Sequence, residues 1–245
     1  HMPLLRNQDR SKISKRKNPT SLNWYREQGF LPEALLNFLG LMGYSMPDGR
    51  EVFSLAEMIE SFSWERVKTG GPVFDLEKLD WLNGEYIRAM PASDFAERMA
   101  REGLAPAGTP IETLRAMAPM VQERVKRFSE VPDATAYFWR ELEYAADDLL
   151  PTKKGAPVHD AGETRTVLEQ VRSVFEQLPQ WKTEAMESAM RAYCDESEWK
   201  VRDLFMTLRI AVTGRAVSTP LFETMEVLGR DESLARLSHA IARLT

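Results

Sequence analysis

The chain has 245 residues, of which 43% are hydrophobic and 28% are charged, and its formal net charge at pH 7 is −5. This composition predicts a folded chain with a sizeable core and room for two or three small domains. The single cysteine, Cys194, excludes an internal disulfide and a cysteine-based zinc site, and it suits a reducing compartment. No apolar run approaches the ~20 residues that span a bilayer, so we expect a soluble, cytoplasmic protein without a membrane partner.

A basic stretch from Lys12 to Lys17 is the first predicted element. Within it Lys12 and Lys15 lie three residues apart, Ser14 stands between them and Arg16 follows. A compact, mobile ammonium can follow phosphate oxygens into a transition state, where a preorganised cation lowers the barrier by several kcal/mol. The stretch therefore suggests a phosphate-handling loop. The alternative is a solvated tail or a general nucleic-acid patch, which basic runs also form.

Positive charge is concentrated in this part of the sequence. Up to residue 17 six basic residues are opposed by one acidic residue, Asp9, whereas the acidic excess falls later, as in Glu141–Glu143 and Asp147–Asp148. A protein that reads one RNA can hold positive charge only along its contact track. The net negative charge therefore does not exclude an RNA partner.

Helical signals dominate from residue 30 onward. Apolar residues at helical spacing predict a helix from Phe30 to Met42, followed by a glycine that stops it. A capping box at Ser54–Glu57 predicts a second helix start. Another at Thr109–Glu112 is stronger, because Pro110 takes the first helical position.

Five further helices are predicted in the second half of the chain, with Gly214 and Gly229 as stops: 162–178, 182–193, 198–213, 221–228 and 231–244. Strand signals are scarce and occur at 51–53 and 72–74, while 151–159 is typical of a loop. These signals predict a mainly α protein with a small β element near its front.

The sequence also carries a family resemblance, most clearly in four segments: Leu41-Met-Gly-Tyr-Ser-Met-Pro-Asp-Gly-Arg-Glu51, Phe62-Ser-Trp-Glu-Arg-Val67, Gly70-Gly-Pro-Val-Phe-Asp-Leu-Glu-Lys-Leu79 and Leu208-Arg-Ile-Ala-Val-Thr-Gly214. With the basic stretch, these resemble bacterial-type glutamyl-tRNA synthetase, a class I enzyme, from its lysine loop onward. The match is specific over residues 4–90 and looser over 91–200, and it returns at 208–214 and 221–223.

The resemblance implies a role for each residue of the basic stretch. Lys12, Ser14, Lys15 and Arg16 would form the KMSKS-like loop that closes over the triphosphate of ATP. Lys15 would meet the charge that develops as pyrophosphate leaves. The parent enzyme would use ATP with Mg²⁺, and we expect neither to be bound to this chain alone.

The same resemblance implies that the chain is part of a longer enzyme. His1-Met2 before Pro3 resembles a cloning scar, and the nucleotide-binding motif of the His-Ile-Gly-His type does not occur in the sequence. We therefore expect a C-terminal part of a glutamate–tRNA ligase, which activates glutamate with ATP and attaches it to tRNA(Glu). Alone, this part should be catalytically inactive and monomeric.

Three domains are implied: the lysine loop with a stem-contact fold at 1–90, and two all-helical anticodon-binding domains at 91–141 and 142–245. Aligned by motif, Arg209 falls where the family places an arginine on the anticodon, with Ser218 and Leu221 nearby. Arg124 falls near an arginine that reads the first anticodon base. Both assignments use the planar, forked guanidinium, which suits the recognition of splayed bases. Arg66 and Lys68 are expected to contact the RNA backbone.

Other interpretations remain open. A stand-alone helical RNA-binding or scaffold module has no use for an ATP-closing loop, so this loop favours the ligase. The glutamyl-queuosine tRNA enzyme lacks the anticodon-binding helices, and the glutaminyl enzyme builds that region from β-barrels. The histidines, His1, His159 and His239, are too scattered to predict a metal site.

Overall fold

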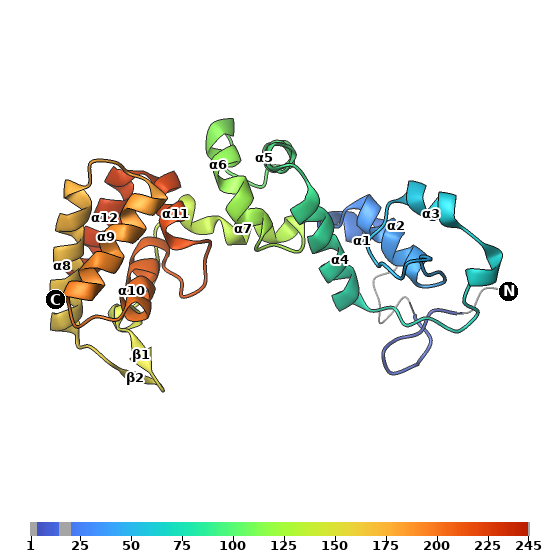
Figure 1. Cartoon of the computed structure of the whole chain (residues 1–245), viewed down its shortest axis with the longest axis horizontal. Helices are drawn as coiled ribbons and strands as arrows, with labels where there is room; N and C mark the ends of the chain where they lie inside the picture. Colours follow the sequence, from blue (N-terminus) through green and yellow to red (C-terminus); the bar gives the residue numbers. More distant parts are fainter. Residues whose placement is uncertain (1–3, 15–20, 245) are drawn as a thin grey trace. The chain divides into compact units, whose positions relative to one another are not determined.

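The structure is a computed structural model that describes residues 4–14 and 21–244 (Figure 1). Its chain divides into two compact units, His1–Asp133 and Ala134–Thr245, called unit 1 and unit 2 below. Helices dominate both units, and the described strands are two residues long. The prediction of a mainly α fold is confirmed. The three-domain division at residues 90 and 141 stays a prediction.

Unit 1 contains short helices joined by tight turns: α1 (Leu22–Glu27), α2 (Pro32–Leu41), α3 (Leu55–Ser61), the 3-10 turn η1 (Trp64–Arg66), α4 (Leu76–Ala89), α5 (Ala92–Arg101), α6 (Ile111–Gln122), the 3-10 turn η2 (Phe128–Glu130) and α7 (Val131–Ala134), which crosses the boundary. The capping box predicted at Ser54 is present: Glu57 N donates to Ser54 Oγ at 3.2 Å, and Ser54 N donates to Glu57 Oε2 at 2.7 Å. Helix α2 lies within the predicted span of Phe30 to Met42 and begins two residues later, at Pro32.

Two buried amides join the front of unit 1 to its later helices. Asn83 in α4 accepts from Leu31 N at 2.8 Å and donates to Lys126 O at 2.6 Å. Gln122 at the end of α6 donates to Ile87 O and to another carbonyl after α4. Because a buried polar group costs free energy unless it is hydrogen-bonded, these amides fix one arrangement of the helices.

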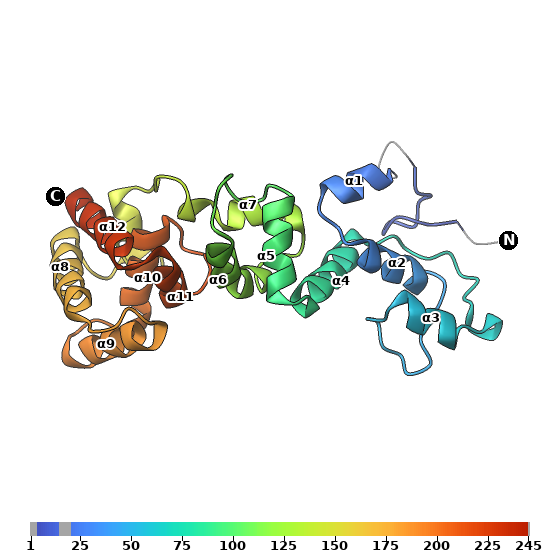
Figure 2. The same cartoon turned by 90° about the horizontal axis from the view of Figure 1, so that it is seen from above.

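Unit 2 is a helical bundle (Figures 1 and 2) with a small hairpin, which Figure 1 labels. Its elements are the 3-10 turns η3 (Ala136–Phe138) and η4 (Ala146–Leu149), the strands β1 (Thr152–Lys153) and β2 (Ala156–Pro157), and the helices α8 (Ala161–Gln177), α9 (Thr183–Glu196), α10 (Val201–Thr213), α11 (Leu221–Leu228) and α12 (Arg230–Arg243). Fully buried apolar side chains from each of these five helices, such as Leu168, Met186, Leu208, Met225 and Leu237, form one core.

Helix α9 receives its N-terminal cap from another helix. Glu226 of α11 accepts hydrogen bonds from Thr183 N at 2.7 Å, from Thr183 Oγ1 at 2.9 Å and from Lys182 Nζ at 2.7 Å. These bonds, first of all the one from Lys182, lower the pKa of Glu226 below its usual value. A carboxylate at this position also satisfies backbone donors that a helix start leaves unpaired.

Three local predictions were wrong. No strand occurs at 51–53 or at 72–74, although Val73 in the second range forms an isolated bridge. The described hairpin instead lies in the segment 151–159, which was predicted as a loop. Its turn uses left-handed conformations at Lys154 (φ 53°) and Gly155 (φ 82°), which suit a two-residue hairpin turn. Helix α6 begins at Ile111 rather than Pro110. The predicted cap from Thr109 is not formed, since Thr109 Oγ1 donates to Pro106 O at 2.7 Å.

Candidate functional site

The start of the lysine loop is anchored to the rest of unit 1. Arg6 forms an antiparallel bridge with Lys12 and a parallel bridge with Val73. The turn between them contains Arg10 in a left-handed conformation (φ 65°). Lys12 and the later Ser14 are solvent-exposed. The backbone therefore presents this basic segment on the surface.

The structure describes only part of the predicted lysine loop. Lys15 and Arg16 lie outside the described residues, so their positions relative to Lys12 and Ser14 are not assigned. The roles of all four residues stay predictions.

In unit 2, Arg209 holds the loop between α10 and α11. Its Nη1 donates to Ser218 Oγ and to Thr219 O, each at 2.8 Å. The sequence placed Arg209 and Ser218 near each other, and the structure brings them into direct contact. A guanidinium with rigid, planar geometry makes such a forked contact well, so the loop has one defined position against α10.

Hydroxyl groups fix the other side of this loop. Thr219 Oγ1 lies 2.5 Å from Tyr137 Oη and 2.5 Å from Thr224 Oγ1. Tyr137 belongs to η3, at the start of unit 2. The three side chains are buried. Together with Arg209 they join η3, α10 and α11 through the loop 214–220.

The end of α10 sets the direction in which this loop leaves. Gly214 is left-handed (φ 69°), and its N–H donates to Ile210 O at 2.7 Å. The next residue, Arg215, donates its backbone N–H to Thr213 Oγ1 at 3.3 Å. Only glycine adopts this conformation without steric cost. The predicted stop at Gly214 is confirmed.

The remaining predicted RNA contacts of unit 2 are mostly inaccessible as side chains. Ser218 is 8% exposed and Leu221 is 4% exposed. Leu221 packs in the core of the bundle. Of these sequence-predicted residues of unit 2, Arg209 retains more exposure and is half-buried.

The three residues predicted to contact RNA in unit 1 are exposed, unlike Ser218 and Leu221. Arg124 follows α6 and is exposed, and Arg66 and Lys68 lie exposed in and after η1. None of these three side chains has a hydrogen-bond or ion-pair partner among the residues that the structure describes. An external anion could therefore bind these three side chains without breaking a contact among the described residues.

A cavity of about 400 Å³ lies beside the Arg209 loop and was not predicted from the sequence. It is lined by Tyr137, Arg140, Thr213 and Arg215 together with Glu141 and Glu143. Arg140 is exposed and has no side-chain partner among the described residues. The only signal for it in the sequence is a single arginine before an acidic run, which did not distinguish it from an ordinary surface residue.

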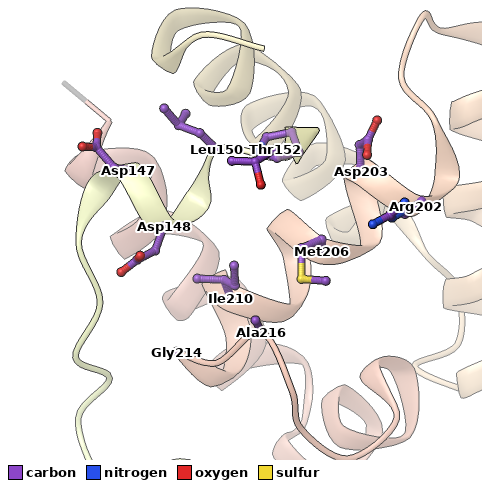
Figure 3. A pocket seen from close by; sticks show the side chains of 11 residues that line it. Asp147, Asp148, Leu150, Thr152, Arg202, Asp203, Met206, Ile210, Gly214 and Ala216 are labelled. Atoms are coloured by element: carbon purple, nitrogen blue, oxygen red, sulfur yellow. The ribbon is translucent and has the colours of Figure 1, made fainter. Parts of the chain in front are cut away.

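A second cavity in unit 2, of about 460 Å³, has mostly acidic side chains among its charged lining residues (Figure 3). Asp147, Asp148 and Asp203 line it with one arginine, Arg202, and Met206 contributes from α10. Three carboxylates against one guanidinium repel a phosphate backbone. This cavity is therefore unsuited to RNA.

Residues 4–14 and 21–244 contain no group of three or more histidine, cysteine, aspartate or glutamate side chains able to hold a metal ion. Within the same ranges, no helix has the length and apolar character needed to cross a membrane.

Comparison with known proteins divides the chain into two matches. Residues 84–241 match the family model described as "Anticodon binding domain". Residues 1–81 match the model described as "tRNA synthetases class I (E and Q), catalytic domain". The first match includes Arg124, Arg209, Ser218 and Leu221, and the second includes the lysine loop.

The relatives and solved structures agree with these matches. The chain is 49% identical to a glutamate–tRNA ligase of Acidothermus cellulolyticus, with 99% of this chain and 49% of the relative covered. It is 44% identical to that of Pseudomonas paraeruginosa, with 100% of this chain and 48% of the relative covered. The crystal structure of a glutamate tRNA ligase from Elizabethkingia meningosepticum in complex with its amino acid has the same fold, with a TM-score of 0.84 at 22% identity, covering 100% of this chain and 51% of that one. This chain spans about half the length of the relatives it matches. It is similar over its whole length to part of these glutamate–tRNA ligases, and it belongs to the anticodon binding domain family.

Proposed function

We propose that this chain is the tRNA-binding part of a ligase that activates glutamate with ATP and attaches it to tRNA(Glu). The observation that carries the proposal is the Arg209 loop, which lies within the residues that match the anticodon binding domain. Base reading requires donors held in fixed positions before the RNA arrives, because ordering them on binding would cost conformational entropy. The contacts of Arg209 with Ser218 and Thr219 supply that order.

In this proposal the loop 214–220 and the half-buried face of Arg209 meet an unstacked base of the anticodon. RNA is read mainly through single-stranded bases, whose edges accept hydrogen bonds and whose faces stack on planar groups. Ser218 and Leu221 act by shaping the loop, since their side chains are almost fully buried. Arg124 reads a second base, and Arg66 and Lys68 contact phosphates.

The lysine loop serves the ATP-dependent step of the complete ligase. Arg6, Arg10 and Lys12 are exposed in the described part of the loop, and a set of cations on one surface turn suits a triphosphate. ATP would supply the adenylyl group that activates the glutamate carboxylate, and pyrophosphate would be the leaving group. Lys12, Ser14, Lys15 and Arg16 would hold its phosphates, and Mg²⁺ would be carried mainly by phosphate oxygens rather than by a protein cage.

The proposal also includes a division into three domains, a monomeric state and a location in the cytoplasm. The three-domain division at 1–90, 91–141 and 142–245 assigns the lysine loop and stem contact to the first part and the anticodon to the other two. We propose that the protein acts as a monomer, because one chain contains each residue assigned here to tRNA. We place it in the cytoplasm.

Direct titration with tRNA tests the binding role. The chain should bind tRNA(Glu) more tightly than a tRNA with unrelated anticodon and acceptor sequences, and the affinity should fall steeply with salt because phosphate contacts release counterions. Equal affinity for the two RNAs, or no binding to either, would show that the proposed function is wrong.

The assignment of the lysine loop requires a separate test in a full-length relative that shares this loop. Replacing the lysine equivalent to Lys15 by alanine should lower kcat far more than it raises the KM for ATP, because the contact forms in the transition state. A change confined to the KM for ATP would contradict that role.

A further inference from the structure

Tyr137 supports the Arg209 loop from within unit 2. Its hydroxyl makes two contacts with one residue of that loop: Thr219 N donates to Tyr137 Oη at 3.3 Å, and Thr219 Oγ1 lies 2.5 Å from the same oxygen. The carbonyl oxygen of Thr219 accepts from Arg209 Nη1 at 2.8 Å. Thr219 is therefore bonded to Tyr137 through its N–H and its hydroxyl, and to Arg209 through its carbonyl.

The direction of each hydrogen bond in this network follows from the acceptor at its end. Pro220 O can only accept, so Thr224 Oγ1 donates to it at 2.6 Å. A hydroxyl has one proton, so the 2.5 Å contact between Thr224 and Thr219 uses the proton of Thr219. By the same count, the contact between Thr219 and Tyr137 uses the phenolic proton of Tyr137. The phenol therefore donates at the start of the network and accepts the N–H of Thr219.

The three hydroxyl groups are sealed from solvent. Tyr137, Thr219 and Thr224 are 3%, 2% and 0% exposed. A buried donor or acceptor that loses its partner costs about 1–3 kcal/mol, and bonds in such a buried chain strengthen one another. Without the phenolic hydroxyl, the N–H and the hydroxyl oxygen of Thr219 would each lose a partner. The peptide at Thr219 would then have to shift to find new ones.

The orientation of Arg209 depends on this peptide. Arg209 is half-buried, and its Nη1 donates to Thr219 O and to Ser218 Oγ, each at 2.8 Å. Ser218 Oγ also donates to Thr219 O at 3.0 Å. A shift of the Thr219 carbonyl therefore changes its direct contact with Arg209 and also the hydroxyl that makes the second contact.

We infer that Tyr137 is a positioning residue for anticodon reading: its hydroxyl sets the Thr219 peptide, and this peptide sets the direction in which Arg209 meets a base. The inference rests on the proposed function, in which Arg209 reads the anticodon. Tyr137 itself is too buried to contact RNA. Its hydroxyl therefore affects discrimination between anticodons, because a misaligned guanidinium loses its hydrogen bonds to a base edge.

Two substitutions break the network at different points. Tyr137→Phe removes the phenolic hydroxyl and keeps the ring. Thr219→Val removes the next hydroxyl but keeps the backbone N–H and carbonyl, whereas Thr219→Ser keeps the hydroxyl as well. Thr207→Val is the matched control, because Thr207 is a fully buried residue of α10, the helix that carries Arg209, and its Oγ1 donates to Leu149 O at 2.9 Å.

The readout is the ratio of affinities for tRNA(Glu) and for the same tRNA with a substituted anticodon. Tyr137→Phe and Thr219→Val should each lower this ratio about fivefold, the size expected for one misplaced hydrogen bond. Thr219→Ser should keep most of the wild-type ratio. Thr207→Val should lower the melting temperature, as Tyr137→Phe does, but leave the ratio unchanged. A purely structural role would give the same result for these last two variants.

A double-mutant cycle shows whether the effect passes through Arg209. In the Arg209→Ala background, Tyr137→Phe should lower the affinity ratio no further, because the group that it positions is already absent. Equal losses of discrimination from Tyr137→Phe in the two backgrounds would mean that Tyr137 acts on the RNA by another route, and the inference would be wrong.

Two other results would also overturn the inference. If the wild type discriminates between the two RNAs and Tyr137→Phe and Thr219→Val discriminate equally well, the positioning role is wrong while the proposed function stands. If Thr207→Val lowers the ratio as much as Tyr137→Phe, the effect is a general loosening of unit 2. Should Tyr137→Phe fail to fold by circular dichroism, the comparison of Thr219→Val with Thr219→Ser decides. A wild type that binds both RNAs equally removes the proposed function itself, and the inference with it.

Discussion

Arg209 and Ser218 are joined by a hydrogen bond of 2.8 Å from Arg209 Nη1 to Ser218 Oγ, and the same nitrogen donates to the next carbonyl at 2.8 Å. The residue that the family resemblance assigns to RNA is thus also the residue that fixes the loop beside it. In the proposed function, base reading and support of the loop therefore depend on the same side chain. Substitutions at its partners can separate them.

Ser218→Ala removes one of the two hydrogen bonds between Arg209 and the loop but leaves the guanidinium and its bond to Thr219 O. We expect it to lower the free energy of unfolding by about 1 kcal/mol and to weaken tRNA binding modestly, with specificity retained. Urea titration and tRNA titration of this variant and of Arg209→Lys measure the two effects. Arg209→Lys should lose specificity, because a lysine lacks the forked donors. Loss of specificity in Ser218→Ala but not in Arg209→Lys would contradict this assignment.

Arg124 differs from Arg209 because its side chain has no partner among the described residues. Arg124→Ala should change the free energy of unfolding by less than about 0.5 kcal/mol but weaken tRNA(Glu) binding by about 1–3 kcal/mol if it reads a base edge. Arg101→Ala is the control, since Arg101 is exposed in the same unit and its nearest carboxylate contact is 3.9 Å. Equal effects of the two variants on tRNA binding would mean that Arg124 acts only through its charge.

Asp80 and Arg127 hold unit 1 together through two parallel hydrogen bonds, Nε to Oδ1 at 2.5 Å and Nη2 to Oδ2 at 2.6 Å. Arg127 also lies over the Phe30 ring, 4.7 Å from its centre. Asp80→Asn leaves this largely buried guanidinium without its counter-charge, so we expect a loss of about 2–3 kcal/mol of stability. Denaturant unfolding of the variant tests this, with Asp94→Asn as an exposed control. Equal stability of the two variants would contradict the structural role of the pair.

The depressed pKa of Glu226 predicts a loss of stability in acid. Because its folded-state pKa lies below the unfolded value, the stabilising effect is fully present above the unfolded pKa of about 4.3 and fades as pH falls through the folded pKa. Glu226→Gln should therefore be less stable than the wild type at neutral pH, and the difference should shrink in acid. Melting curves across this range, with Glu223→Gln as a control on the same helix, measure it. A difference that is constant with pH would contradict the proposed origin.

Local signals in the sequence predicted the helices of unit 2 well. Helix α11 has the predicted bounds and α10 ends at Gly214 as predicted, because apolar spacing and glycine stops depend on neighbouring residues. Contacts between distant residues were not predictable: Tyr137 and Thr219 are 82 positions apart. The hairpin turn at Lys154 was missed because a lysine in a left-handed conformation carries no sequence signal. The family motif located Arg209 but not the hydrogen bonds that hold its loop.

The central claim, that Arg209 and its loop read the anticodon, is tested most directly by the ratio of affinities for tRNA(Glu) and for the same tRNA with a substituted anticodon. The wild-type chain should prefer the cognate tRNA, and Arg209→Ala should lose about 1–3 kcal/mol of that preference while it remains folded by circular dichroism. If Arg209→Ala keeps the full preference of the wild type, Arg209 only supports its loop, and the anticodon is read elsewhere or not at all.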